Sequence, residues 1–427
     1  MASPRIGVVG GGLAGLAAAV ALKEAGCEIE LFERSRVLGG RATSFHINGR
    51  EVDNGQHVFL ACYTEFLDFV RGLGMAAHLH LQDRFDVLVL SRRGEASRLR
   101  SAALPAPWHL VASFFRYRHL GWRAKLEVAR ALARAREAAV FDGTFAEWLA
   151  RLGQGEGALR GFWRPFFVPA LNAPLDEVSA ADAGFVLRTA FLQHPGAARI
   201  GYFTVPLAGL AAAAAARLDR VHLANAVTAL DLSGDRAVLV SSGGTRVALD
   251  GVVVAVPPSR LAGLLDAGRY GISVDGYDSH PIVDVHVWHD RGALGFDLAA
   301  LLDSPVQWVF AKAPGYLCCS LSAADRLIQD PTTDLLALCW EELRQAIPGL
   351  RGGRLLDGNA TRSPEGTFLA RPGTRRPGPG TSDPRLAIAG SWTGTGWPDT
   401  LESAVRSGRA AARHVLQGLR ETSWTTH

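Results

Sequence analysis

The chain has 427 residues, of which 48% are hydrophobic and 20% charged, and its formal net charge is only +4. A charge this small and dispersed, with no basic block, argues against a nucleic-acid partner. The five cysteines are odd in number and include no C-x-x-C pair, which favours a reducing compartment over a secreted disulfide framework. The scattered histidines lack cysteine or carboxylate partners at zinc-site spacing, so we expect no metal site.

The N-terminus is apolar but lacks the features of a leader peptide. The run that follows Arg5 is broken by three glycines and continues into residues 23–28, KEAGCE, without a small-x-small cleavage site. No window holds the roughly 18 continuous apolar residues that a membrane-spanning helix needs. We therefore expect a cytoplasmic protein, which could still work at the inner face of the membrane.

The first predicted elements form one compact unit. Residues 5–10, RIGVVG, predict a buried strand, and residues 13–25 predict an alanine- and leucine-rich helix closed by Gly26. Residues 28–33, EIELFE, predict a second strand that ends on Glu33. Strand, turn, helix and strand are the first unit of a parallel sheet.

The middle of the chain has a helical sequence pattern first and a strand pattern after it. Residues 140–195 are helical in pattern, and TFAEWLARLG within them predicts a helix with Thr144 as its N-cap and Gly153 as its end. Alternating strand-like segments return over residues 221–258, separated by Ser-Gly-Asp and Ser-Gly-Gly turns.

The α/β pattern comes back near the C-terminus. Residues 371–384 predict a proline- and glycine-rich surface loop, residues 385–390, RLAIAG, a buried strand, and a helix is expected from about Asp399 to Gly418. Because this length exceeds one hydrophobic core, we expect two packed domains, one of them assembled from separated segments.

The first glycine-rich turn predicts a dinucleotide site. Gly10, Gly12 and Gly15 form G-x-G-x-x-G between a strand and a helix, where glycines permit a tight turn and a close approach to pyrophosphate. The helix N-terminus at Leu13 and Ala14 offers backbone N–H groups and a positive dipole. Glu33 lies 18 residues past Gly15, where a carboxylate can accept hydrogen bonds from a ribose. These features leave NAD and FAD open.

The next segment favours FAD. Gly39, Gly40 and Arg41 form a second glycine turn with a cation suited to phosphate. Flavoproteins of the amine oxidase and phytoene desaturase superfamily carry such a G-G-R, and this chain resembles them. Residues 52–59, VDNGQHVF, are similar to the segment of that superfamily that lies along the flavin ring.

This resemblance implies an α/β fold with a Rossmann-like FAD-binding domain of the GR2 type, assembled from discontinuous segments, and an inserted α+β substrate-binding domain. We place the FAD-binding domain at residues 1–60, 205–270 and 365–427. The substrate-binding domain then takes residues 61–204 and 271–364.

The C-terminal glycine turn completes the expected cofactor site. By the resemblance, the helix after residues 388–398 points its N-terminus at the flavin pyrimidine, where its dipole stabilises the negative charge of the reduced ring. Asp399 and Glu402 form an Asp-x-x-Glu capping pattern behind Pro398. The superfamily's final strand commonly ends in Gly-Asp, whereas this one ends in Gly390 and Ser391.

Three segments narrow the resemblance further. Residues 145–154, 162–180 and 393–408 resemble the hydroxysqualene dehydroxylases, the squalene-associated flavoproteins of bacterial hopanoid synthesis, and the similarity covers nearly the whole chain. It implies that reduced flavin passes a hydride to an allylic carbocation as water leaves, giving squalene and oxidised FAD. Only one dinucleotide fingerprint is present, so an external electron donor is expected.

The resemblance also implies the site residues. The expected FAD contacts are Gly10, Gly12, Leu13, Ala14, Gly15, Glu33, Arg34, Gly40, Arg41, Gly55, Gln56, His57, Val227, Gly390, Ser391, Thr400 and Leu401. The departing hydroxyl needs a general acid and a dry pocket. The candidate catalytic residues are Asp53, His57 and Glu177.

Large apolar side chains suit a long isoprenoid substrate. Residues 161–172 and 185–193 supply them, although the same pattern is equally typical of an ordinary core. Residues 104–125 carry apolar side chains at helical spacing, flanked by aromatic residues and followed by arginines. That pattern predicts peripheral membrane contact, and it also suits a lid helix over the substrate domain.

Two rival functions stay open. The first is a carotenoid-type desaturase or an amine oxidase of the same superfamily, which would move the hydride the other way. The second is a non-catalytic isoprenoid-binding carrier, against which the intact glycine loops argue.

Overall fold

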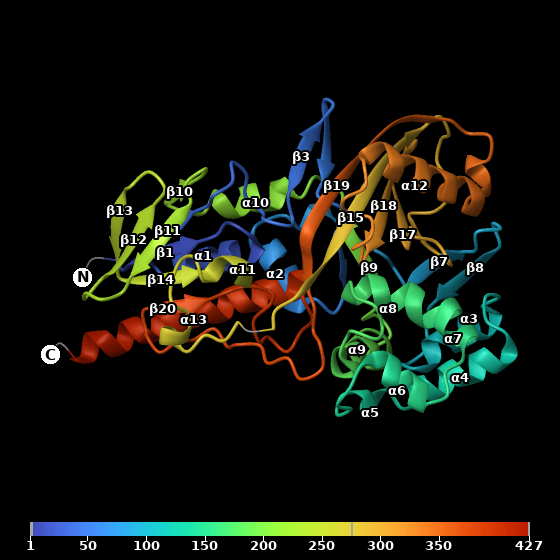
Figure 1. The fold of residues 1–427 in the computed structure, drawn as a ribbon, viewed down its shortest axis with the longest axis horizontal. Helices are drawn as coiled ribbons and strands as arrows, with labels where there is room; N and C mark the ends of the chain where they lie inside the picture. Colours follow the sequence, from blue (N-terminus) through green and yellow to red (C-terminus); the bar gives the residue numbers. More distant parts are fainter. Residues whose placement is uncertain (1–2, 275, 426–427) are drawn as a thin grey trace.

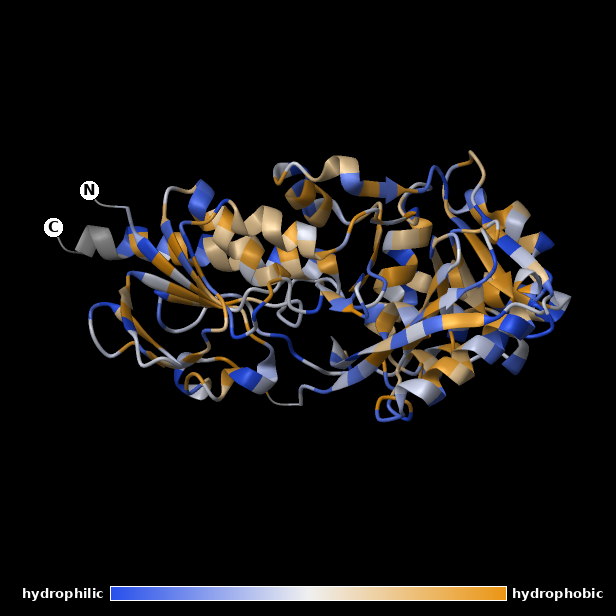
Figure 2. Cartoon of the chain, turned by 90° about the horizontal axis from the view of Figure 1, so that it is seen from above, coloured by the Kyte–Doolittle hydropathy of each residue, from blue (hydrophilic) through white to orange (hydrophobic). Residues whose placement is uncertain are grey.

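The computed structural model describes residues 3–274 and 276–425. The molecule is elongated, with a parallel sheet and its helices at one end and a large mixed sheet with a helical layer at the other (Figure 1). We call these the parallel-sheet half and the large-sheet half. The described part of the chain begins and ends at the far side of the parallel-sheet half (Figures 1 and 2).

The parallel sheet draws its five strands from four separated parts of the chain. Its order is β10-β2-β1-β14-β20, and every neighbouring pair is parallel. The bounds are β1 Arg5–Val9, β2 Glu28–Phe32, β10 Arg220–His222, β14 Gly251–Val254 and β20 Leu386–Ile388. Strands covered on both faces are almost wholly apolar, and the central ones are fully buried here. The predicted α/β class and the assembly from discontinuous segments are confirmed.

Helices cover one face of this sheet and a small antiparallel sheet covers the other. On the helical face α1 (Leu13–Glu24) packs against α13 (Leu401–Thr425), with α2 (Thr64–Gly72) and α10 (Ala208–Ala215) in the same apolar cluster. A Cβ at Gly408 would lie 2.2 Å from the Ala14 carbonyl oxygen, so the helix crossing needs a glycine there. The other face packs on β11 (Val227–Asp231), β12 (Ala237–Ser241) and β13 (Arg246–Leu249).

The seven-stranded sheet dominates the large-sheet half. Its order is β19-β15-β18-β17-β16-β7-β8, antiparallel except for the parallel pair β16 and β7. The bounds are β7 Asp86–Leu90, β8 Ala96–Arg100, β15 Ser279–His289, β16 Leu298–Leu301, β17 Trp308–Ala313, β18 Tyr316–Ser322 and β19 Leu355–Phe368. Helix α12 (Thr332–Ala346) covers one face.

A helical layer packs on the other face of the large sheet (Figure 1). Its helices are α3 Val111–Arg116, α4 Trp122–Ala133, α5 Ala135–Ala138, α6 Phe145–Arg151, α7 Glu156–Ala158, α8 Arg164–Leu171 and α9 Ala180–Val186, with π-helical turns at Leu159–Trp163 and Leu187–Leu192. The predicted N-cap Thr144 is confirmed, and the structure adds a capping box: the Thr144 hydroxyl accepts the Glu147 N–H at 3.2 Å, and Glu147 accepts the Thr144 N–H at 2.8 Å.

Short strands join the two halves. The hairpin β3 (Ser44–Ile47) and β4 (Arg50–Asp53) leads into a three-stranded sheet of β5 (Val58–Leu60), β9 (Ile200–Phe203) and β6 (Leu79–Leu81). The predicted domain boundaries stay a prediction, and β19 runs across the one placed between residues 364 and 365.

The C-terminal helix corrects one expectation. It runs from Leu401 to Thr425 instead of from about 399 to 418, and the Thr400 hydroxyl accepts the Ser403 N–H at 3.2 Å as an N-cap does. The predicted Asp399 and Glu402 capping pair is wrong because each carboxylate serves another segment. Asp399 binds Arg41, and Glu402 accepts backbone N–H groups at the start of α2.

The part of the chain that the structure describes contains no helix both long and apolar enough to cross a bilayer.

Candidate functional site

The first glycine loop leaves an open cradle at the start of α1. Gly10 has φ +105°, and a Cβ at Gly15 would lie 1.9 Å from the Gly10 carbonyl oxygen, so both positions require glycine. At Gly12 an added Cβ would meet only the Gly40 Cα, at 3.9 Å. Helix α1 begins there with no side-chain cap and no acidic residue in its first turn. Free N–H groups at such a helix start fit a phosphate.

Glu33 stands beside this cradle. Its carboxylate accepts the N–H of Gly11 and the N–H of Ser35, both at 2.7 Å, which fixes it at the carboxyl end of β2. Its backbone carbonyl accepts the Asn225 N–H at 2.9 Å, so the chain just before Val227 lies next to it. The predicted ribose and adenine residues are therefore brought to one place, with Arg34 exposed beside them.

The second glycine loop packs directly on the first. The Gly39 N–H donates to the Gly11 carbonyl at 2.8 Å, and a Cβ at Gly40 would lie 3.0 Å from the Gly12 Cα. The two glycine turns predicted from separate motifs thus make one continuous backbone surface.

Arg41 reaches from this surface to the C-terminal turn. Its guanidinium donates to Ser391 Oγ at 2.7 Å, to both carboxylate oxygens of Asp399 at 2.9 and 3.0 Å, and to the Gly366 carbonyl at 2.5 Å. Burial alone would raise the pKa of Asp399, but the Arg41 charge lowers that pKa below its ordinary value. The pair is therefore ionised at neutral pH.

Residues 53–57 connect the glycine loops to the large sheet. Asp53 accepts hydrogen bonds from Ser44 Oγ and the Leu207 N–H, both at 2.9 Å, and from Lys312 Nζ at 3.2 Å. Lys312 also donates to Gln56 Oε1 at 2.7 Å. Lys312 therefore fixes two residues of the segment that is expected along the flavin ring.

A buried carboxyl group lies under the same segment. A Cβ at Gly55 would come within 2.1 Å of Asp284 Oδ2, so the Asp284 carboxyl packs against the Gly55 backbone. Burial raises the pKa of Asp284 to about 7, although the Ser320 hydroxyl and the Gln56 N–H act in the opposite direction. Its Oδ1 atom is buried without a hydrogen-bond partner.

Two histidines beside this cluster are neutral at pH 7. Burial lowers the pKa of His57, whose Nε2 lies 3.2 Å from the Arg41 carbonyl oxygen. Burial and the charge of Lys312 lower the pKa of His286 to about 4, and its Nδ1 is 2.8 Å from the Tyr316 hydroxyl.

Sequence reasoning missed Lys312, Asp284 and His286. A signal existed in β15, where PIVDVHVWH places polar Asp284 and His286 at alternate positions of an otherwise apolar strand. Period-two alternation puts both on one face of the sheet, opposite the face that α12 covers. Nothing in the local sequence marks Lys312.

The C-terminal turn is held by an arginine from the predicted surface loop. Arg376 donates to the backbone carbonyls of Ser391, Trp392 and Trp397 and lies 3.5 Å from Ser403 Oγ. Residues 371–384 therefore do more than line the surface, because one of their side chains fixes the turn before α13.

Glu177 lies in a different network from Asp53 and His57. It pairs with Arg371 at 2.9 Å and with His280 at 3.4 Å, and His280 also contacts Asp325 at 2.7 Å. This arrangement connects β15 to the segment before α9 rather than to residues 53–57.

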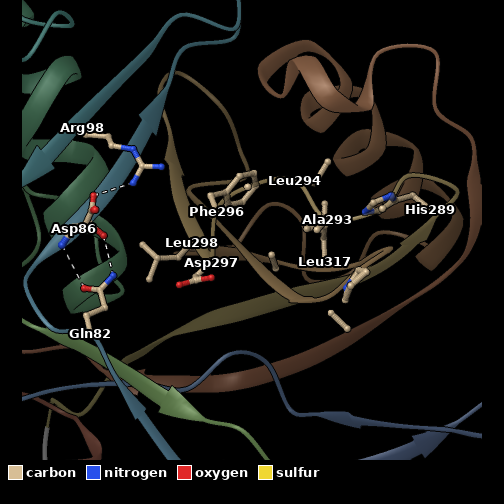
Figure 3. A pocket seen from close by; sticks show the side chains of 15 residues that line it. Gln82, Asp86, Arg98, His289, Ala293, Leu294, Phe296, Asp297, Leu298 and Leu317 are labelled. Atoms are coloured by element: carbon tan, nitrogen blue, oxygen red, sulfur yellow. Dashed lines mark hydrogen bonds and ion pairs between the residues drawn. The ribbon is translucent and has the colours of Figure 1, made fainter.

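A pocket of about 380 Å³ opens on the large sheet, away from this cluster (Figure 3). Ala311 and Ala313 of β17 line it, whereas Lys312 between them contacts Asp53. A β-bulge lies between Ala311 and Ala313, and none of Asp53, Gln56, Lys312 and Asp284 lines the pocket. The pocket is therefore separate from the candidate site.

Comparison with known proteins agrees with this geometry. The family model described as flavin containing amine oxidoreductase matches residues 13–416. Hydroxysqualene dehydroxylase of Rhodopseudomonas palustris is 30% identical, over 97% of this chain and 99% of that protein. Hydroxysqualene dehydroxylase of Zymomonas mobilis is 26% identical, over 96% and 98%. Zeta-carotene desaturase of Synechocystis is 32% identical over 38% of this chain and 36% of that protein.

Solved structures share the fold at low identity. Putrescine oxidase bound to putrescine superposes with a TM-score of 0.73 and 16% identity, covering 97% of this chain and 99% of that one. Cyclohexylamine oxidase from Brevibacterium oxydans superposes with a TM-score of 0.73 and 17% identity, covering 98% of this chain and 100% of that one. The chain therefore belongs to the flavin containing amine oxidoreductase family, is a flavin-dependent oxidoreductase, and has hydroxysqualene dehydroxylases as full-length relatives.

Proposed function

We propose that this protein binds FAD and reductively removes the allylic hydroxyl of hydroxysqualene to give squalene. The observation that carries this proposal is that the candidate flavin site and a string of aromatic rings both adjoin the same face of the large sheet. The glycine-loop surface and residues 53–57 border the polar face of the large sheet, and a string of aromatic rings leads from that face to the protein surface. The full-length hydroxysqualene dehydroxylase relatives support this substrate over an amine.

FAD would lie across both glycine loops, with its pyrophosphate at the start of α1. Bound in its reduced form, it would supply the hydride. The protein's own part is to hold the ring, exclude water and provide a proton. Lys312 holds the segment along the ring through Asp53 and Gln56. Thr400 and Leu401 place the start of α13, whose positive dipole end favours added electron density on a ring that it faces.

The leaving hydroxyl needs a proton donor, and the surroundings of each candidate support one choice over the others. Glu177 is tied to Arg371, the Asp53 carboxylate accepts three hydrogen bonds, and His57 is neutral. Asp284 retains its proton over much of the neutral range, because burial raises its pKa to about 7. Asp284 therefore joins the sequence-derived candidates as the favoured donor in this proposal.

The aromatic string supports a long apolar substrate. From the large sheet outward, Phe310, Trp308, Phe166, Phe162 and Phe114 make successive ring contacts of 5.5 to 6.2 Å between centroids. All but Phe310 are only partly buried, in contrast to the fully buried core rings near them. An isoprenoid chain is the class of ligand that such a wall of rings would solvate.

The outer end of this string is an exposed apolar patch. Phe115 contacts Phe114 and Trp122, and the side chains of Trp108, Trp122 and Leu126 are all more than half exposed. The same segment carries the exposed Arg116, Arg118 and Arg123, and Lys125 donates to the Phe115 carbonyl. We propose that this patch contacts the membrane that holds the substrate, since aromatic rings and cations suit a headgroup region.

Tyr117, one of the aromatic residues predicted to contact the membrane, departs from that expectation. Tyr117 is fully buried, and its hydroxyl donates to the Gly161 carbonyl at 2.8 Å. It anchors the helical layer instead of facing lipid.

The proposed membrane contact can be tested by flotation. A double substitution, Phe115→Asp with Trp122→Asp, should reduce flotation with anionic vesicles, whereas Leu356→Asp on β19 should not.

The reaction itself can be tested with the purified protein. Flavin absorbance should bleach on anaerobic photoreduction and return when hydroxysqualene is added, with squalene formed. A flavin that is instead reduced by an added carotenoid or amine would support the oxidase alternatives. A protein that cannot take up FAD would support the carrier. Rapid bleaching by NADPH alone would refute the proposed external electron donor.

A further inference from the structure

The Arg41 junction holds together three segments that are far apart in the chain. Arg41 comes from the second glycine loop, Ser391 and Asp399 from the turn before α13, and Gly366 from the end of β19. Asp399 also accepts the Phe368 N–H at 2.7 Å. Each contact crosses from one segment to another, so the junction joins the second glycine loop, the end of β19 and the turn before α13.

The hydrogen bonds of this junction leave Arg41 little capacity for a ligand. A guanidinium has five N–H donors. The four bonds to Gly366, Ser391 and Asp399 occupy both terminal nitrogens. In this arrangement Arg41 is built as a clamp between protein segments, rather than as the bidentate phosphate ligand that its G-G-R motif suggests.

Asp399 determines the position of that clamp. Its side chain is 6% exposed, whereas that of Arg41 is 42% exposed, so the carboxylate is the fixed partner and the arginine reaches to it from the open site. Bidentate pairing fixes both the distance and the plane of the guanidinium. Arg41 Nη2 donates one hydrogen bond to Asp399 Oδ1 and a second to the Ser391 hydroxyl.

We propose that Asp399 is a positioning residue of the flavin site: by locking Arg41 it holds the second glycine loop against the C-terminal turn, and flavin is retained only while this clamp is closed. The inference concerns flavin retention and does not depend on the substrate of the proposed function.

The test measures the flavin dissociation constant of the full-length holoprotein by equilibrium dialysis, without substrate. Asp399→Asn should raise this constant about tenfold, the change that 1.4 kcal/mol produces. Arg41→Met should raise it by a similar factor, and the double variant should be no worse than either single one, because both substitutions open the same clamp. Asp303→Asn is the matched control, since Asp303 forms a bidentate pair with Arg160 on the large-sheet half, at 2.9 and 2.6 Å. It should leave flavin binding unchanged.

Two results would overturn the inference. Flavin binding unaffected by Asp399→Asn would show that the clamp is not needed. Effects of the two single substitutions that multiply, with Arg41→Met much the larger, would show that Arg41 acts on the flavin directly.

A relocated carboxylate separates positioning from general stability. In Ser391→Asp with Asp399→Ser, a carboxylate returns to Nη2 of Arg41 from the neighbouring position. If Asp399→Asn also lowers the melting temperature, this double variant distinguishes positioning from general stability. Flavin affinity restored in the double variant supports the clamp, and flavin affinity that stays reduced refutes it.

Discussion

Replacing Asp284 by asparagine should change how the stability of this protein depends on pH. The carboxyl has an ordinary pKa of 3.8 and a folded pKa of about 7, so between these values the folded state binds more protons than the unfolded state. Stability from this group is therefore lost as pH rises from about 4 to about 7 and is constant above. At about 1.4 kcal/mol per pH unit, the full difference corresponds to about 4 kcal/mol, of which about 3 kcal/mol falls between pH 5 and pH 8.

The assay is urea unfolding of the holoprotein at several pH values. Asparagine cannot ionise, so Asp284→Asn should gain about 3 kcal/mol relative to the natural protein on going from pH 5 to pH 8. Asp357→Asn on the neighbouring strand β19 is the control, because Asp357 forms an exposed pair with Arg50. If Asp284→Asn and the natural protein show parallel pH profiles, Asp284 is not held protonated by burial and its proposed role as proton donor fails as well.

The remaining predictions concern backbone and capping. Gly15→Ala adds a Cβ 1.9 Å from a carbonyl oxygen of the same loop. It should lower the free energy of unfolding by roughly 1–3 kcal/mol and reduce the amount of flavin that the protein retains on desalting. Gly121→Ala is the control, because no atom lies within 4 Å of the added Cβ, and it should change neither quantity. Glu402→Gln removes a fully buried charge that accepts N–H groups of α2 and should lower the free energy of unfolding by about 2 kcal/mol, while Glu421→Gln should not. Tyr117→Phe should cost about 1 kcal/mol in urea unfolding, because it removes one buried hydrogen bond; no change would mean that this bond contributes nothing net.

The sequence was most informative where local rules govern the backbone. The first strand, helix and strand, the glycine loop and the Thr144 cap all follow from short-range spacing, and the structure has them within one or two residues. The same rules misassigned Asp399 and Glu402. Their spacing suits a cap, but an ionised carboxylate goes to the strongest donors available in three dimensions, and these come from Arg41 and the start of α2.

The rest of the candidate site depends on tertiary contacts that no local pattern reveals. Lys312 lies more than 250 residues from its partners Asp53 and Gln56, and its neighbours in sequence are ordinary strand residues. The raised pKa of Asp284 is likewise a property of packing, since it arises from burial beneath Gly55. Such features become visible only when the two halves are placed together.

The strands of the parallel sheet are far apart in the sequence, and this affects how the protein folds during synthesis. The partner of strand β1, β14, is made some 240 residues after it, and β20 and α13 come later still. On the ribosome the apolar surface of α1 must therefore wait for α13 before it is covered, and such non-local closure is slow and exposes the chain to aggregation. Flavin cannot serve as a folding template while only the first glycine loop has been made, because the turn at Gly390 and Ser391 that completes its site is made much later.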